Sequence, residues 1–307
     1  MTIEQTLNQC RSFDVNNASL SLWVFKKSIS QNANFTARSV VVTDALKVLL
    51  KEIVSSTMER YSEVEPYSLL AQPNEVGCLC LETDETIFSE LQDIIDLPVE
   101  EKLINNIKQI ENSAGYVVRL QVDGEVLYCV RRLAENWSTK KRVSVINTIL
   151  NGNQLDVVSD QTFSIGKTFD FFATATDILV FNKANFESLL NYKLMYSDSF
   201  ATLQQDAAFV AAFTNMVPLI SHIGTNTMHL RRMAVIQQKN LFADAVYMGR
   251  LRHINIQRKW NIQFDAQGRI DPTDDTIRTI MQVLLNHRLR SELSEDDYDV
   301  NSSIPVS

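Results

Sequence analysis

The amino-acid sequence predicts an α+β fold, in which a mixed, largely antiparallel sheet is followed by a helix-rich C-terminal part. Two observations carry this prediction. Strand-like segments in the first part of the chain are joined by tight turns, which force neighbouring strands to run antiparallel. From residue 185 to about residue 251, apolar residues instead recur at the three- and four-residue spacing of helices.

The composition is that of an ordinary folded protein, with 45% hydrophobic and 21% charged residues in a chain of 307. This length allows one large domain or two smaller ones. We expect a boundary in the charged stretch 134–143, which separates an N-terminal α/β region (1–143) from a C-terminal region (144–307).

The charge balance limits the classes of function. The chain holds 29 Lys and Arg residues against 37 Asp and Glu residues, a net charge of −8, which excludes a uniformly basic nucleic-acid coat but not a local basic patch. No apolar run approaches the ~18 residues of a membrane span, and the N-terminal segment lacks the pattern of a secretory signal. We therefore expect a cytoplasmic protein that does not itself insert into a membrane.

The N-terminal part is expected to alternate strands with helices. Enrichment in β-branched and aromatic residues predicts strands at 19–25 and 35–42, followed by a helix that begins at Thr43 or Asp44. The apolar residues of this helix share one stripe: Leu46, Leu49, Leu50, Ile53 and Val54. Next come a strand at 76–82 and a helix at 86–97, ended by Pro98.

Three hairpins are predicted from their turns. The clearest joins 115–122 to 125–132 through Asp123-Gly124, because this pair supplies the positive φ angles that a two-residue turn requires. The second joins 168–174 to 177–183, and the third returns after Gly268.

Helices dominate the remainder of the chain. An Ala-, Phe- and Val-rich run from Leu203 to Val217 is expected to end at Pro218. The last predicted helix begins at Thr273 with Asp274 and Asp275 in its first turn, and leads to an acidic tail that we expect to be frayed or bound to a partner.

Catalytic motifs are scarce. No pattern for a bound phosphate, a zinc ion or an activated serine occurs, so we expect no cofactor and no metal. The best acidic set for a nuclease is Asp170, Asp177 and Glu187 with Lys183 nearby, since phosphodiester cleavage needs a carboxylate-bound Mg²⁺. Such acids more often serve a hairpin turn or the first turn of a helix, so an enzyme is only the alternative.

Charge is distributed unevenly along the chain. Residues 82–101 hold eight acids and no Lys or Arg, whereas residues 222–260 hold seven Lys and Arg residues against Asp244. A smaller basic set follows the first hairpin. The candidate DNA-binding residues of the two sets are Arg231, Arg232, Lys239, Arg250, Arg252, Arg258 and Lys259, and Arg131, Arg132, Lys140, Lys141 and Arg142.

Two geometries fit the larger basic set. Spacings of seven and eight place Arg231 or Arg232 on one helical face with Lys239, and the shared parity of residues 250, 252 and 258 would align them on one strand face. Either arrangement suits contacts to phosphates. Ion pairing with the protein's own acidic segments, or a protein interface, explains the same charges.

Residues 169–200 combine an aromatic hairpin, FDFF…ILVFN, with an Asn-Phe-Glu at 185–187 that opens a helix, and with Tyr192 and Tyr196 after it. This segment resembles the core of the KwaB family of the two-gene Kiwa anti-phage defence system, and the likeness is most specific across residues 115–300. The resemblance implies a DNA-binding effector, a homodimer that associates with the membrane protein KwaA. The acidic run 82–101 or the acidic tail is then expected to face that partner.

The leading hypothesis is a non-enzymatic anti-phage effector. It would hold duplex DNA through backbone contacts, with little sequence preference because no base-reading module is visible, and would block phage DNA replication or expression after recruitment to the inner membrane. The alternatives are a metal-dependent nuclease and a protein scaffold without a role in nucleic-acid binding.

Overall fold

The computed structural model describes residues 3–27, 35–83, 86–133, 148–151, 154–157, 163 and 165–300. The chain divides into two compact units. The N-terminal unit comprises Met1–Tyr67 and Pro73–Leu190, and the C-terminal unit comprises Ser68–Gln72 and Asn191–Ser307. The boundary expected at 143/144 falls outside the described residues and stays a prediction.

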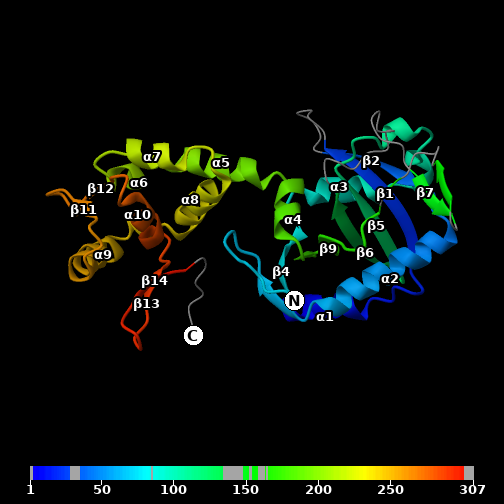
Figure 1. The fold of residues 1–307 in the computed structure, drawn as a ribbon, viewed down its shortest axis with the longest axis horizontal. Helices are drawn as coiled ribbons and strands as arrows, with labels where there is room; N and C mark the ends of the chain where they lie inside the picture. The colour runs from blue at the N-terminus through cyan, green and yellow to red at the C-terminus, as the bar shows by residue number, and fades with distance from the viewer. Residues whose placement is uncertain are drawn as a thin grey trace. The chain divides into compact units, whose positions relative to one another are not determined.

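The predicted α+β class is confirmed (Figure 1). The N-terminal unit contains an eight-stranded sheet in the order β2-β1-β5-β6-β9-β10-β4-β3, in which only the β3–β4 pair is parallel. Its strands are β1 (Ser19–Lys27), β2 (Phe35–Val40), β3 (Glu63–Pro66), β4 (Gly77–Glu82), β5 (Gly115–Val122), β6 (Glu125–Arg132), β9 (Phe171–Ala173) and β10 (Asp177–Val180). Strands β7 (Thr148–Asn151) and β8 (Gln154–Val157) form a separate pair.

The three predicted hairpins are present. Asp123 and Gly124 adopt φ angles of 50° and 84°, and Val122 pairs with Glu125, as a two-residue turn requires. The second hairpin is β9–β10, and the third pairs β11 (Gln263–Phe264) with β12 (Ile270–Asp271) around Gly268, whose φ is 80°.

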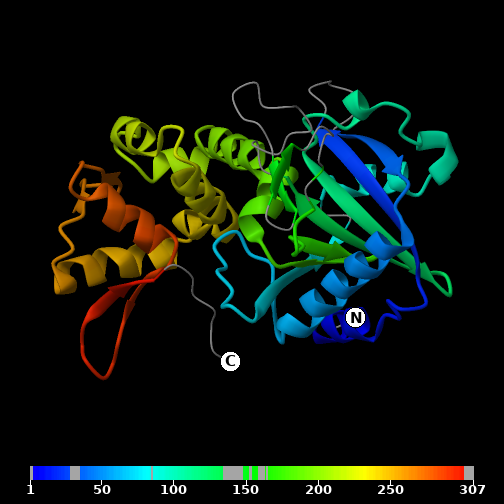
Figure 2. The same ribbon diagram turned by 45° about the vertical axis from the view of Figure 1, so that its right-hand side comes forward.

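Helices cover both faces of the large sheet (Figures 1 and 2). On one face, α1 (Ile3–Ser12) and α2 (Asp44–Arg60) join a core cluster with β1, β5 and β6. On the other, Phe88 of α3 (Phe88–Ile95) and Phe186 of α4 (Lys183–Leu189) both pack against the ring of Phe171. Strands such as β4 are therefore buried without alternation.

Local signals explain where these helices begin. The hydroxyl of Thr43 accepts a hydrogen bond from the Leu46 N–H and caps α2, as predicted. The Asn182 side chain likewise accepts from the Asn185 N–H and caps α4. Single 3₁₀ turns occur at η2 (Val99–Lys102) and η3 (Ile107–Gln109).

The C-terminal unit is helical, as predicted. Its elements are α5 (Tyr192–Leu203), α6 (Ala207–Ala211), α7 (Val217–Ile223), α8 (Thr227–Lys239), η4 (Leu241–Ala243), α9 (Ala245–Arg258), α10 (Ile277–Leu284) and the pair β13 (Arg288–Arg290) with β14 (Asp297–Asp299). Asn226 and Asp244 cap α8 and α9 with their side chains.

Three details of the sequence prediction are wrong in this unit. Pro218 begins α7 instead of ending a helix, because proline suits the first helical turn, where its missing N–H costs nothing. The last helix begins at Ile277, and Asp274 and Asp275 lie in the turn before it. Residues 291–299 of the tail are not frayed, because they complete the β13–β14 hairpin, while a partner bound to the tail stays a prediction.

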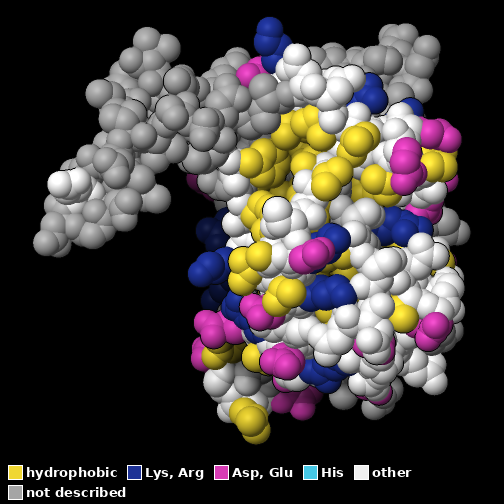
Figure 3. Space-filling view, turned by 90° about the vertical axis from the view of Figure 1, so that its right-hand side faces the viewer, with side chains coloured by type: hydrophobic (Ala, Val, Ile, Leu, Met, Phe, Trp, Pro, Cys, Tyr) yellow, Lys and Arg dark blue, Asp and Glu magenta, His cyan; other side chains and the backbone are white. Residues whose placement is uncertain are grey.

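No helix in the described part of the chain has both the length and the apolar character needed to cross a membrane. Figure 3 shows the face that lies at the right of Figure 1, where hydrophobic side chains gather and Lys and Arg side chains are interspersed with Asp and Glu. The described residues on that face form no continuous cationic surface.

Candidate nucleic-acid interface

Arg131 and Arg132, two of the predicted DNA-binding residues, hold a buried carboxylate. Arg131 Nη1 lies 2.9 Å from Asp170 Oδ1, and the backbone N–H of Arg132 donates to Asp170 Oδ2 at 2.6 Å. Asn185 Nδ2 donates to Oδ1 at 2.8 Å, and Arg132 Nη1 donates to Asn185 Oδ1 at 3.2 Å. These contacts join β6, the segment before β9, and α4.

The pKa of Asp170 reflects its position. Its side chain is fully buried, and this burial raises the pKa above its usual value. Hydrogen bonds from Asn185 and Arg132, and the charge of Arg131, act in the opposite direction. Asp170 and its donors therefore form a structural hub that leaves the Arg131 and Arg132 side chains with internal partners.

The structure does not gather the proposed nuclease residues into a metal site. Glu187 Oε1 accepts from the Tyr67 hydroxyl at 3.0 Å and lies 3.7 Å from Lys183 Nζ, while Asp177 accepts from the Thr176 hydroxyl at 2.6 Å. Among the residues that the structure describes, no group of three or more His, Cys, Asp or Glu side chains is placed to hold a metal ion.

The basic residues of α8 mostly have internal contacts. The Arg231 guanidinium lies 5.5 Å from the centre of the Tyr196 ring. Lys239 Nζ donates to the Leu285 carbonyl at 2.7 Å, at the C-terminal end of α10, where a helix exposes carbonyl groups. Arg232 is half-buried. Spacing along α8 placed these residues correctly on a helix but did not reveal their partners.

The basic residues of α9 do not share one strand face. All except Lys259 lie on the helix, where residues 250 and 252 are turned roughly 200° apart. Arg252 Nη1 donates to the Gly268 carbonyl at 3.1 Å, and Arg258 pairs with Asp297 at 3.0 Å. Arg250 and Lys259 are exposed and make no side-chain hydrogen bond or ion pair with described residues.

The outward face of α9 collects groups suited to phosphates. Arg250, His253 and Gln257 are exposed and stand three and four residues apart, which places them on one stripe of the helix. Gln257 Nε2 and His253 Nε2 lie 2.9 Å apart. The helix contains no acidic residue, and Lys259 follows at its C-cap with a φ of 55°.

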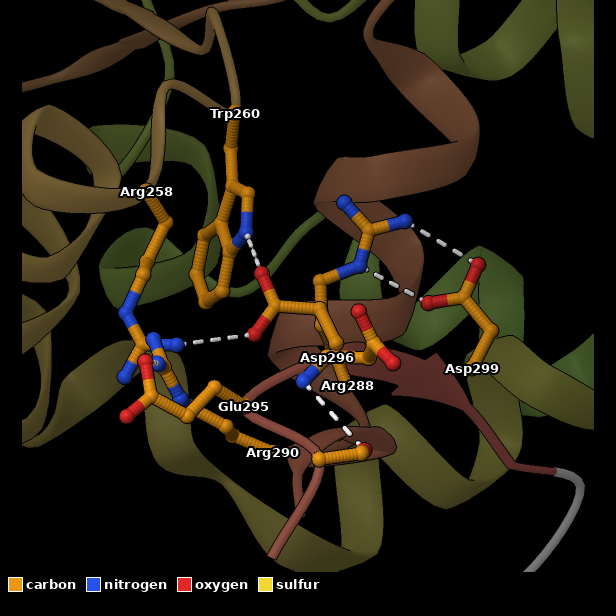
Figure 4. A network of polar contacts seen from close by, with 9 residues as sticks. Arg258, Trp260, Arg288, Arg290, Glu295, Asp296 and Asp299 are labelled. Atoms are coloured by element: carbon orange, nitrogen blue, oxygen red, sulfur yellow. Dashed lines mark hydrogen bonds and ion pairs between the residues drawn. The ribbon is translucent and has the colours of Figure 1, made fainter. Parts of the chain in front are cut away.

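Acidic residues of the tail form ion pairs with some of the basic residues. Ion pairing with the protein's own acidic segments was one of the alternatives that the sequence left open. Asp297 accepts from Arg258 and, through Oδ2, from Trp260 Nε1 at 2.8 Å (Figure 4). Within the hairpin, Arg288 binds Asp299 through two hydrogen bonds of 2.8 and 3.0 Å, and Arg290 pairs with Glu295 at 2.8 Å. Hydrogen bonds from Arg288 lower the pKa of Asp299.

The remaining predictions concern the second basic set and the acidic run 82–101. Lys140, Lys141 and Arg142 lie outside the described residues. In the acidic run 82–101, Asp96 accepts hydrogen bonds from Arg119 and from the Tyr128 hydroxyl, so its partners lie within the N-terminal unit. Glu100 and Glu101 of the same run are exposed.

Lowering the pH is expected to destabilise the C-terminal unit through His287. Burial, with the positive charges of Lys239 and Arg232, lowers the pKa of this histidine to about 4. The unfolded chain binds the same proton near pH 6.5, so stability is complete above about pH 6.5 and falls as the pH drops toward 4. Urea unfolding of wild type and His287→Gln between pH 7 and 4.5 should show a smaller loss in the variant.

An exposed histidine provides the control for this titration. His253→Gln removes a side chain on the outward face of α9. If His253→Gln flattened the pH dependence as much as His287→Gln, the buried ring would not be its source.

The chain thus contains an α+β unit and a helical unit, and the helical unit carries exposed cations. Residues 110–294, more than half of the chain, match the family described as Kiwa protein KwaB-like. The chain belongs to this family, which places it in the Kiwa anti-phage defence system. No curated protein and no solved structure gives a significant match.

The match covers the segment on which the resemblance rested. The Asn-Phe-Glu of residues 185–187 is explained by packing: Asn185 binds Asp170, Phe186 packs on Phe171, and Glu187 binds Tyr67. The resemblance is confirmed.

Proposed function

We propose that this Kiwa protein binds DNA through the outward face of α9, as a non-enzymatic effector that contacts the phosphate backbone. One observation carries the proposal: Arg250 and Lys259 are exposed cations that have no side-chain partner among the described residues, at a helix that holds no acid. Exposed Lys and Arg side chains gain affinity by replacing the counterions condensed on DNA. His253 and Gln257 add polar groups on the same stripe that can contact phosphate or sugar.

The half-buried cations are less suitable for testing this proposal, because they also make contacts inside the protein. Arg231, Lys239, Arg252 and Arg258 have aromatic, carbonyl or carboxylate contacts inside the C-terminal unit. Replacing them would disturb folding as well as charge. Arg250 and Lys259 are therefore the residues on which to test binding.

Reversing both exposed cations is expected to weaken DNA binding. In the variant Arg250→Glu/Lys259→Glu, the magnitude of the negative slope of log K against log salt should fall by about two, because two phosphate contacts are lost. Affinity at low salt should fall by about tenfold or more. Fluorescence anisotropy of a labelled duplex in EDTA, over a salt series, measures both quantities.

A matched control separates local contacts from net charge. Lys108→Glu/Lys193→Glu makes the same change in net charge at two exposed lysines that do not belong to α9. Equal loss of binding in the two double variants would contradict a site on α9. Binding to wild type that does not respond to salt would contradict the backbone mechanism itself.

A cleavage assay tests the enzymatic alternative. Incubating plasmid with the protein and Mg²⁺ or Mn²⁺ should leave it intact under the proposed function. Cleavage that disappears in EDTA and in Asp177→Asn, a partly exposed member of the acidic set, would support the nuclease instead.

The assembly is proposed from family membership alone. A second copy of this chain and a KwaA-like membrane protein, which would recruit the chain to the inner membrane, are the expected partners. Light scattering after gel filtration measures the first association, and co-purification from membranes measures the second.

A further inference from the structure

A pocket of about 330 Å³ opens beside α9 in the C-terminal unit. Its apolar wall is formed by Leu251 and Ile254 of α9 and by Val283 of α10, and Leu251 and Val283 are themselves buried. Tyr247 lines the pocket as well, and its hydroxyl is already bound to the Val283 carbonyl. The interior is thus mainly apolar, with a size in the range of small-molecule sites, ~300–1,000 Å³.

The aromatic side of the pocket is held in place by several contacts. Trp260 donates its indole N–H to Asp297, and the Arg288 guanidinium lies 5.6 Å from the centre of the indole ring. Arg288 in turn binds Asp299 (Figure 4). Its Nη1 also donates to the Thr279 hydroxyl at 3.1 Å. Because these contacts already order the indole ring in the folded protein, a ligand that packs on its flat face would lose little further side-chain entropy.

One residue that lines the pocket is a cation without a partner among the described residues. The charge of Arg288 is matched by Asp299, whereas Arg250 lines the same pocket and has no hydrogen-bond or ion-pair partner among the described residues. The pocket therefore combines an apolar and aromatic interior with a single available positive charge. A nucleotide has the complementary pair, a flat base and a phosphate.

We propose that this pocket receives an unstacked base of a DNA strand while Arg250 binds an adjacent phosphate. The inference rests on the proposed function, because Arg250 belongs both to the outward face of α9 and to the pocket. Contact between a base and an aromatic side chain favours any base, since each has a flat face. The protein should therefore prefer DNA with an unpaired nucleotide over an intact duplex, without reading its sequence.

The test compares an intact duplex with the same duplex carrying one extra unpaired thymidine. Wild type should bind the bulged duplex about tenfold more tightly, the size of one stacking contact. Ile254→Trp fills the pocket without changing charge and should bind both duplexes equally. Ile256→Trp makes the same change at a position that is 77% exposed on α9 and does not line the pocket, and it should keep the preference.

The outcomes separate the pocket from the DNA site. Salt-sensitive binding of the intact duplex with no preference for the bulge overturns the pocket alone, and so does a preference that survives in folded Ile254→Trp. Absence of binding to both duplexes overturns the proposed function together with this inference. Ile254→Phe, a smaller filling, replaces Ile254→Trp if circular dichroism shows that the larger side chain prevents folding.

Discussion

Replacing Asp170 with alanine is expected to lower the free energy of unfolding by about 3–5 kcal/mol. The carboxylate is fully buried and accepts hydrogen bonds from Arg131, the Arg132 N–H and Asn185. Alanine would leave a guanidinium, an amide and a backbone N–H without their acceptor. Urea unfolding, followed by circular dichroism, measures the loss.

A nearby aspartate provides the matched control. Asp177 lies in the same hairpin but is partly exposed, and its carboxylate accepts from Thr176. Asp177→Ala should cost about 1 kcal/mol, the typical value of one hydrogen bond. Similar losses for the two alanine variants would show that Asp170 does not organise this part of the fold.

Truncating Phe186 to alanine is expected to cost about 3–5 kcal/mol, for a different reason. Its fully buried ring meets the rings of Phe171 and Tyr67 edge to face, with centroids 5.1 and 5.8 Å apart. Alanine would leave a cavity between α4 and the sheet. The same unfolding experiment measures the effect.

Two controls define the cavity contribution. Phe186→Leu keeps most of the volume and should cost less than about 1.5 kcal/mol. Leu194→Ala removes a side chain that is 63% exposed on α5 and should change stability by less than about 0.5 kcal/mol. A loss in Phe186→Ala no larger than in Leu194→Ala would mean that the ring adds little to the core.

The fold could be predicted where local signals determine it. Asp123-Gly124 defines its hairpin because only a few residues tolerate two positive φ angles in succession, and Thr43 defines the start of α2 through one side-chain hydrogen bond. The helix boundary at Pro218 was wrong because proline is compatible both with the residues after a helix and with its first turn.

The candidate site could be predicted only in part. The cationic stretch 222–260 could be recognised from its composition. The carboxylate partners of Arg131 and Arg258, however, each lie 39 residues further along the chain. Such pairs depend on tertiary packing, which sequence spacing does not encode. Acids at 297 and 299 have the same two-residue spacing as Arg288 and Arg290, and this match was the signal that could have indicated a tail hairpin.

The strand order of the large sheet also determines when each strand can pair during synthesis on the ribosome. The apolar strand β4 pairs with β10, in a register that joins Glu82 to Asp177, 95 residues later. At ~5–20 residues per second, β4 waits about 5–20 s during synthesis for this neighbour. During that interval its unpaired edge can associate with another nascent chain. We expect chaperone dependence to be concentrated in this window of translation.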